Sequence, residues 1–82
     1  METKEIADVM SVLNELKGDN TVPKNVRLKI EDAANILNED TEMEMKVSRV
    51  LNKLEETAED VNLQPYTRTQ IWDAISLLEK NK

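Results

Sequence analysis

The residues of this sequence that are best suited to binding chemistry are cations and aromatic side chains that follow two turns. They are Lys24, Arg27, Tyr66, Arg68 and Trp72, with Lys29 nearby. An arginine fork grips carboxylates and phosphates, and Arg, Tyr and Trp dominate the binding energy of protein interfaces. The chain is otherwise acidic, with a net charge of -6 from 11 basic and 17 acidic residues. These residues therefore predict an anchoring surface for an acidic partner.

A structural role for the same residues competes with the binding role. Arg27 and Arg68 each follow a turn at which a helix is expected to end, and the last carbonyls of a helix lack helical partners. Those carbonyls, together with Asp19 or Asp60, could hold the two arginines as structural clamps. Trp72 has a similar alternative, because it either covers the edge of a thin aliphatic core or is a partly exposed anchor for a partner.

Catalysis has little support in the composition. The chain has no His and no Cys, which removes the usual base near neutral pH, the commonest nucleophile pair and the best transition-metal ligands. A single Gly leaves no glycine-rich phosphate loop. The acidic run 39–44 lacks the order of a calcium-binding loop and suits the first turn of a helix. We therefore predict a non-enzymatic protein with no catalytic residues, no cofactor and no metal site.

One stretch of the sequence recurs in the second half of the chain. Its identical residues are Arg27, Ile30, Asp32, Ala33 and Leu37, which return in the same order and spacing as Arg68, Ile71, Asp73, Ala74 and Leu78. The apolar residues that precede this stretch follow the same offset. The pattern predicts two copies of a helical hairpin, the first over about 3–38 and the second over about 41–80.

Apolar residues three and four positions apart predict four amphipathic helices. We expect them at about 3–17, from Pro23 to residue 37, from 42 to 58, and at about 66–80. Pro23 suits a first helical position, where a missing N–H costs nothing. Because Pro65 stands one position later in the second copy than Pro23 does in the first, we expect the two turns to enter their helices differently.

The helix ends carry recognisable capping residues. Gly18 is expected to be a left-handed cap at the end of the first helix. Two pairs have the form of a capping box that opens the third and fourth helices; they are Thr41 with Glu44 and Thr67 with Gln70. Two further expectations concern methionines: Met43 falls on the buried stripe of the third helix, and Met45 falls off it.

Four short-looped helices must alternate in direction, so we predict an all-α, up-down-up-down four-helix bundle that forms a single domain over residues 1–82. A pair of HEAT-like hairpins is the competing architecture. Two repeats are too few for a stable solenoid, because each hairpin leaves an apolar face that a neighbouring repeat must cover. The closed bundle is therefore favoured.

The turn motifs resemble those of a family of small archaeal proteins, number 0147 among the uncharacterised protein families. The resemblance rests on the run 19–23 followed by Val26-Arg27, and on Pro65, 67–69 and Ile71-Trp72. It covers essentially the whole chain. It implies a compact four-helix bundle from an archaeon with no assigned activity, and it supplies no catalytic residues to carry over.

Two functions remain open. The favoured one is a non-enzymatic interaction module that presents a rigid helical face to another protein, a second copy of the chain included. The alternative is association with RNA or the ribosome through basic residues of the cluster and stacking on its tyrosine; they are Lys24, Arg27, Lys29, Arg68 and Tyr66. The net charge of -6 weakens this alternative.

The sequence also bears on location. No apolar run approaches the roughly 18 residues that a membrane helix needs, and the first residues lack the basic flank and apolar stretch of a signal peptide. The absence of Cys agrees with a reducing compartment. We therefore expect a cytoplasmic protein without a membrane partner.

Overall fold

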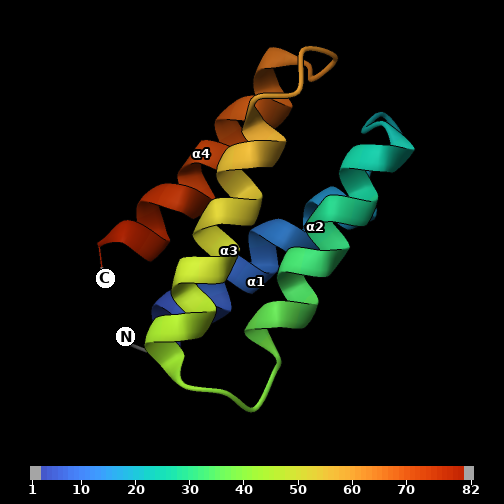
Figure 1. Ribbon diagram of the computed structural model, residues 1–82. Helices are drawn as coiled ribbons and strands as arrows, with labels where there is room; N and C mark the ends of the chain where they lie inside the picture. Colours follow the sequence, from blue (N-terminus) through green and yellow to red (C-terminus); the bar gives the residue numbers. More distant parts are fainter. Residues whose placement is uncertain (1–2, 81–82) are drawn as a thin grey trace.

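The computed structural model describes residues 3–80, which form four helices and no strand (Figure 1). The helices are α1 (Thr3–Lys17), α2 (Lys24–Leu37), α3 (Met43–Ala58) and α4 (Pro65–Glu79). They run in alternating directions, so the turns 18–23 and 59–64 lie at one end of the molecule and the loop 38–42 lies at the other (Figure 1). The predicted all-α, up-down-up-down four-helix bundle is confirmed.

The order of helix contacts separates this bundle from two stacked HEAT-like hairpins. Each helix packs against its two neighbours in a closed ring: α1 against α2 and α4, and α3 against α2 and α4. Stacked hairpins would instead bring α1 against α3 and α2 against α4. Within the described residues, neither of those diagonal pairs has Cα atoms within 8 Å. The radius of gyration, 11.7 Å, also equals the roughly 11.7 Å expected for a compact domain of this length.

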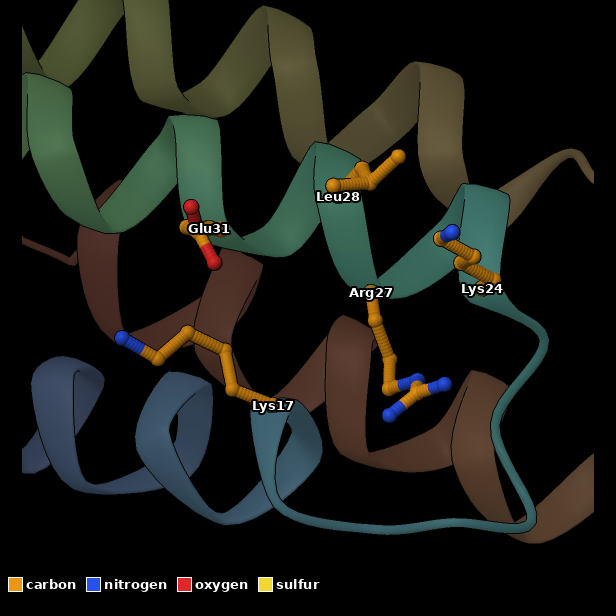
Figure 2. A pocket seen from close by; sticks show the side chains of 5 residues that line it. All are labelled: Lys17, Lys24, Arg27, Leu28 and Glu31. Carbon is orange, nitrogen blue, oxygen red and sulfur yellow. The ribbon is translucent and has the colours of Figure 1, made fainter.

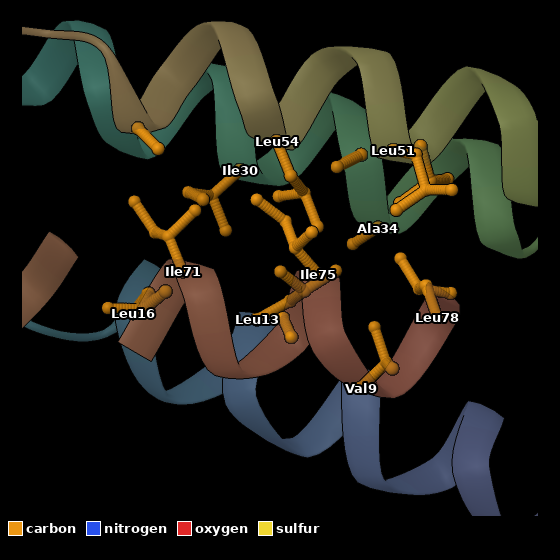
Figure 3. Packing of buried hydrophobic residues seen from close by; sticks show 14 of the residues in the cluster. Val9, Leu13, Leu16, Ile30, Ala34, Leu51, Leu54, Ile71, Ile75 and Leu78 are labelled. Carbon is orange, nitrogen blue, oxygen red and sulfur yellow. The ribbon is translucent and has the colours of Figure 1, made fainter. Parts of the chain in front are cut away.

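The core is aliphatic and receives side chains from all four helices (Figure 3). Every buried apolar side chain in the described part of the chain belongs to Val, Leu, Ile or Ala. The fully buried positions follow the predicted three- and four-residue spacing, as in Val9, Leu13 and Leu16 of α1. Ile6 and Met10, on the same stripe, are only partly buried. The periodicity therefore identified the core, because apolar residues on one helix face must close against the neighbouring helices.

The two hairpin turns at one end of the bundle share a hydrogen bond from a backbone N–H to an aspartate side chain. The Asp19 carboxylate accepts from the backbone N–H of Thr21 at 2.8 Å, and the Asp60 carboxylate accepts from that of Asn62 at 2.8 Å. Both are Asx turns, in which an aspartate side chain replaces a backbone acceptor. The repeat seen in the sequence thus extends to the geometry of the turns.

The expectation that the two turns enter their helices differently is wrong. The first helical hydrogen bond joins Arg27 N–H to Pro23 O in one copy and Arg68 N–H to Gln64 O in the other, each at 3.0 Å. Pro23 is the cap residue before α2, whereas Pro65 is the first residue of α4. Neither position needs a backbone N–H, so the proline can shift by one residue without changing the turn.

Neither predicted capping box forms. The residue before α3 is Glu42 and not Thr41, and no side chain caps that helix. The α4 helix begins upstream of Thr67, which is a buried residue inside the helix and 3% exposed. It occupies the place that a valine fills in the first copy, so core packing decides its environment rather than local capping.

Two further expectations about single residues are wrong. Gly18 does not have a positive φ angle, and its N–H donates to Asn14 O at 3.2 Å, so it extends the last turn of α1 in an ordinary conformation. Met43 is 37% exposed because it is the first residue of α3, at the rim of the bundle. Met45 does lie off the buried stripe and is 59% exposed.

Candidate functional site

Arg68 is a clamp between the first turn of α4 and the end of α3. Its Nε donates to Ala58 O at 3.1 Å and its Nη2 donates to Asp60 O at 2.8 Å. α3 ends at Ala58, so the guanidinium satisfies carbonyls near a helix end that have no helical partner. These are the carbonyl contacts that the structural alternative predicted for Arg68.

Arg27 occupies the equivalent position in the first copy but has no such contacts. Within residues 3–80 its guanidinium forms no hydrogen bond and no ion pair, and its Nε is buried without a partner. The side chain extends from α2 toward the turn that follows α1 (Figure 2). The structure therefore divides the arginine pair, which the sequence pattern presents as one unit.

A pocket of about 180 Å³ lies beside Arg27, between α1 and α2 (Figure 2). Its lining comprises three cationic side chains, one carboxylate and one apolar side chain, contributed by Lys17, Lys24, Arg27, Leu28 and Glu31. We refer to it as the Arg27 pocket. The cations form no ion pair within the described residues, so the pocket is a concentration of positive charge on an acidic molecule.

Three residues of the Arg27 pocket were not predicted from the sequence, namely Lys17, Leu28 and Glu31. Leu28 and Glu31 could have been grouped with Lys24 and Arg27 from the sequence, because positions 24, 27, 28 and 31 have the spacing of one helix face. The contribution of Lys17 depends on how α1 packs beside α2, and sequence spacing does not give that. Lys29, which the sequence grouped with the cluster, forms an ion pair with Glu56 of α3 at 3.6 Å and so lies on the other side of α2.

Both aromatic side chains are on the outside of the bundle. Tyr66 is 67% exposed and Trp72 is 45% exposed, and both belong to α4. Thr69, which lies between them, and Asp73, which follows Trp72, are also exposed. We call this surface the α4 outer face. Of the five predicted partner-binding residues, the structure thus brings Lys24 and Arg27 together in one pocket, places Tyr66 and Trp72 on one helix, and uses Arg68 within the fold.

The turn beside the Arg27 pocket contains the carboxylate whose pKa is perturbed. The Thr21 hydroxyl donates to Asp19 Oδ1 at 2.6 Å and the Thr21 backbone N–H donates to the same oxygen at 2.8 Å. These two hydrogen bonds, and to a smaller extent the charge of Arg27, lower the pKa of Asp19 below its ordinary value of 3.8. Asp19 is therefore ionised at neutral pH and holds the turn.

Metal-binding and membrane-spanning features are both absent from the described part of the chain. Residues 3–80 contain no group of three or more His, Cys, Asp or Glu side chains placed to bind a metal ion. None of the helices in these residues has both the length and the apolar character to cross a membrane.

An all-helical bundle built from two copies of one hairpin is the class of protein that the fold defines. Comparison with known proteins gives it a family: the model of the Uncharacterised protein family (UPF0147) matches residues 1–80, and the chain belongs to this family. The resemblance carried by the turn motifs is thereby confirmed. The family description assigns no activity.

Relatives of the chain come from archaea and have a similar length. A UPF0147 protein of Thermoplasma volcanium is 40% identical over 73 residues, which are 88% of this chain and 82% of the relative. A UPF0147 protein of Methanocaldococcus jannaschii is 37% identical over 75 residues, 90% of this chain and 81% of the relative. The crystal structure of the unknown function protein MMP1188 covers 100% of this chain and 94% of that chain, with a TM-score of 0.92 and 35% identity.

Proposed function

We propose that the protein is a non-enzymatic interaction module that binds another protein through the α4 outer face. The observation that carries the proposal is the exposure of both aromatic side chains, Tyr66 at 67% and Trp72 at 45%. In the described residues the buried apolar side chains are all aliphatic, so neither aromatic side chain is part of the buried core. Aromatic residues left outside a closed core are well suited to anchor a partner.

Covering the α4 outer face would contribute substantially to the free energy of binding. If a partner buried roughly 100 Å² of the apolar surface of Trp72, the hydrophobic effect would contribute about 2.5 kcal/mol. That gain alone is about a seventyfold change in a binding constant. Tyr66 adds an apolar ring and a hydroxyl that can form a hydrogen bond across an interface.

The geometry of α4 allows one partner surface to reach both anchors. Six residues of α-helix rise about 9 Å, and the two side chains leave the helix about 120° apart. The exposed Thr69 between them and the exposed Asp73 next to Trp72 give the face the mixture of aromatic and polar groups that is typical of a non-obligate interface. The bundle can therefore remain folded alone and bind reversibly.

We commit to a partner of different sequence rather than a second copy. Two copies would each contribute a net charge of -6, and like charges oppose association at long range. RNA, the other open alternative, is supported less well. Two of the cations that could bind RNA already have other partners, since Arg68 donates to backbone carbonyls and Lys29 pairs with Glu56. Few of them are left to contact phosphates together.

The test is affinity capture from the source cell with the wild-type protein and with the double variant Tyr66→Ala/Trp72→Ala. Met45→Ala is the matched control, because Met45 is 59% exposed but belongs to α3. We expect one saturable protein partner whose capture falls at least tenfold with the double variant and is unchanged with the control. Circular dichroism and thermal unfolding establish that all three proteins are folded.

Three outcomes would contradict the proposal. Capture that disappears after nuclease treatment would indicate RNA. Concentration-dependent dimerisation of the purified protein, lost in the double variant, would make the partner a second copy. Equal loss of capture with Met45→Ala would mean that the α4 outer face has no special role.

A further inference from the structure

Arg27, which lines the Arg27 pocket, has a buried polar atom that the fold leaves unsatisfied. Within the described residues Arg27 Nε is buried and has no acceptor. A buried donor without a partner costs about 1–3 kcal/mol. Arg68 avoids this cost in the equivalent position by donating its Nε to Ala58 O. The hairpin therefore offers a way to satisfy this arginine, and Arg27 does not use it.

The second copy of the hairpin also shows that the turn does not need the lysines of the pocket. At the offset that aligns Arg27 with Arg68, Lys17 corresponds to Ala58 and Lys24 to Pro65. The second turn nevertheless has the same Asx hydrogen bond as the first. The cations of the first copy are thus additions to a turn that folds without them, which leaves them available for binding.

The charge and size of the pocket restrict what it can bind. Three cations from α1 and α2 face about 180 Å³ of space, and Glu31 is the one carboxylate in the lining. None of the three cations is ion-paired within the described residues. A compact oxyanion fits this arrangement. Leu28, which also lines the pocket and is 52% exposed, adds an apolar contact next to the charge.

We infer that the Arg27 pocket binds a carboxylate carried by an acidic peptide segment. Arg27 supplies the planar fork that matches a carboxylate, Lys24 adds a second positive charge, and Leu28 packs against an apolar side chain beside the acid. Phosphate is attracted by the same cations, but it has no apolar group to contact Leu28, so the lining favours a carboxylate that stands next to an apolar side chain. The inference goes beyond the proposed function, because it requires neither aromatic residue of the α4 outer face.

The test follows the three arginine Nε–H signals of the chain by NMR during titration with the capped dipeptide Ac-Glu-Leu-NH2. The ionic strength is held constant, and Ac-Gln-Leu-NH2 serves as the neutral control. We expect a saturable shift of the Arg27 signal, no shift of the Arg49 and Arg68 signals, and no response to the neutral peptide. Inorganic phosphate, used as a second probe, should bind more weakly than the acidic dipeptide.

Variants complete the test, with the backbone N–H signals of the 18–23 turn as the readout. Arg27→Gln should weaken binding of the acidic dipeptide at least tenfold, because it removes a charge-assisted fork. Lys24→Gln should weaken binding about threefold; Lys24 is exposed and forms no contact that the fold needs, so this variant tests the site even if Arg27→Gln does not fold. Arg49→Gln, which removes an exposed cation of α3, is the matched control and should bind normally.

Several results would overturn the inference. Equal shifts of all three arginine signals would mean non-specific screening by the ligand. Unchanged binding in both Arg27→Gln and Lys24→Gln would place the carboxylate elsewhere. Tighter binding of phosphate than of the acidic dipeptide would assign the pocket to a phosphorylated ligand instead. Because the α4 outer face is intact in these variants, failure here leaves the capture experiment with Tyr66→Ala/Trp72→Ala unaffected.

Discussion

Arg68 and Arg27 stand at equivalent positions of the two hairpins, and within the described residues only Arg68 donates hydrogen bonds to the end of the preceding helix. The backbone around the two residues is the same, since each N–H closes the first helical hydrogen bond at 3.0 Å. The difference is therefore in the side chains alone. One copy uses its arginine to hold a helix end, and the other leaves it at a pocket.

This difference predicts unequal effects of the same substitution on stability. Arg68→Gln should lower the free energy of unfolding by about 2–3 kcal/mol, because two charge-assisted hydrogen bonds to backbone carbonyls are lost. For a domain of this size that corresponds to a fall in Tm of roughly 10–20 °C. Arg27→Gln should not lower the free energy of unfolding, because it removes no hydrogen bond or ion pair within the described residues and it removes a buried donor that has no acceptor. Thermal and urea denaturation of the two variants measure both values, and equal losses would show that Arg27 is also a structural clamp.

The Asx turn predicts how Asp19 titrates. Its pKa lies below 3.8, chiefly because of the Thr21 hydroxyl. A lowered pKa in the folded state means that the ionised carboxylate stabilises the fold above pH 3.8, and that this stabilisation is lost as the pH falls through the folded pKa. We expect an NMR titration to give a midpoint below 3.8, and Thr21→Val to raise it.

Arg27→Gln is the companion variant for that titration. It should raise the midpoint of Asp19 less than Thr21→Val does, because the charge of Arg27 lowers the pKa of Asp19 less than the hydrogen bond from the Thr21 hydroxyl does. If the Asp19 midpoint is at or above 3.8 in the wild-type protein, the hydrogen bonds described for this turn are not formed in solution.

The parts of the fold that the sequence predicted are those that depend on periodic burial. The spacing of Val9, Leu13 and Leu16 identified a helix face, and the constant offset between the two copies identified the pairing of hairpins. Both signals arise from many residues acting together, so one unusual residue does not hide them. The helix bounds predicted from them agree with the structure at α1 and differ from it by about one residue at α2, α3 and α4.

The parts that the sequence did not predict depend on single contacts between helices. Thr67 matches a capping pattern, but packing places it in the core. Arg27 and Arg68 occupy equivalent positions in the repeat. Only the surroundings of each guanidinium show that Arg68 Nε has a hydrogen-bond acceptor and that Arg27 Nε has none within the described residues. Lys17 joins the Arg27 pocket from α1, and no local pattern relates it to α2. These features could not be predicted from the sequence because they depend on tertiary contacts between helices.

Gly18 gives a direct test of one such correction. If it were a left-handed cap, replacement by alanine would destabilise the protein, because residues with a Cβ disfavour positive φ. Its φ is not positive, and a Cβ added there would lie 3.7 Å from Asn14 O and 3.8 Å from Glu15 O, which is ordinary contact. Gly18→Ala should therefore raise the free energy of unfolding by about 0.5–1 kcal/mol, since alanine restricts the unfolded chain. A Tm lower than that of the wild-type protein would instead indicate that Gly18 is a left-handed cap.

Trp72 is the only tryptophan of the chain, so its fluorescence reports on the α4 outer face alone. At 45% exposure, the indole should emit toward the red and be quenched by acrylamide about half as efficiently as in the urea-unfolded protein. Addition of the captured partner should shift the emission to the blue and protect it, because an interface excludes water from its anchors. The measurement is made at dilutions where sedimentation shows a monomer. Blue-shifted and fully protected emission under those conditions would mean that Trp72 already packs against the bundle, and the α4 outer face would then lose its main anchor.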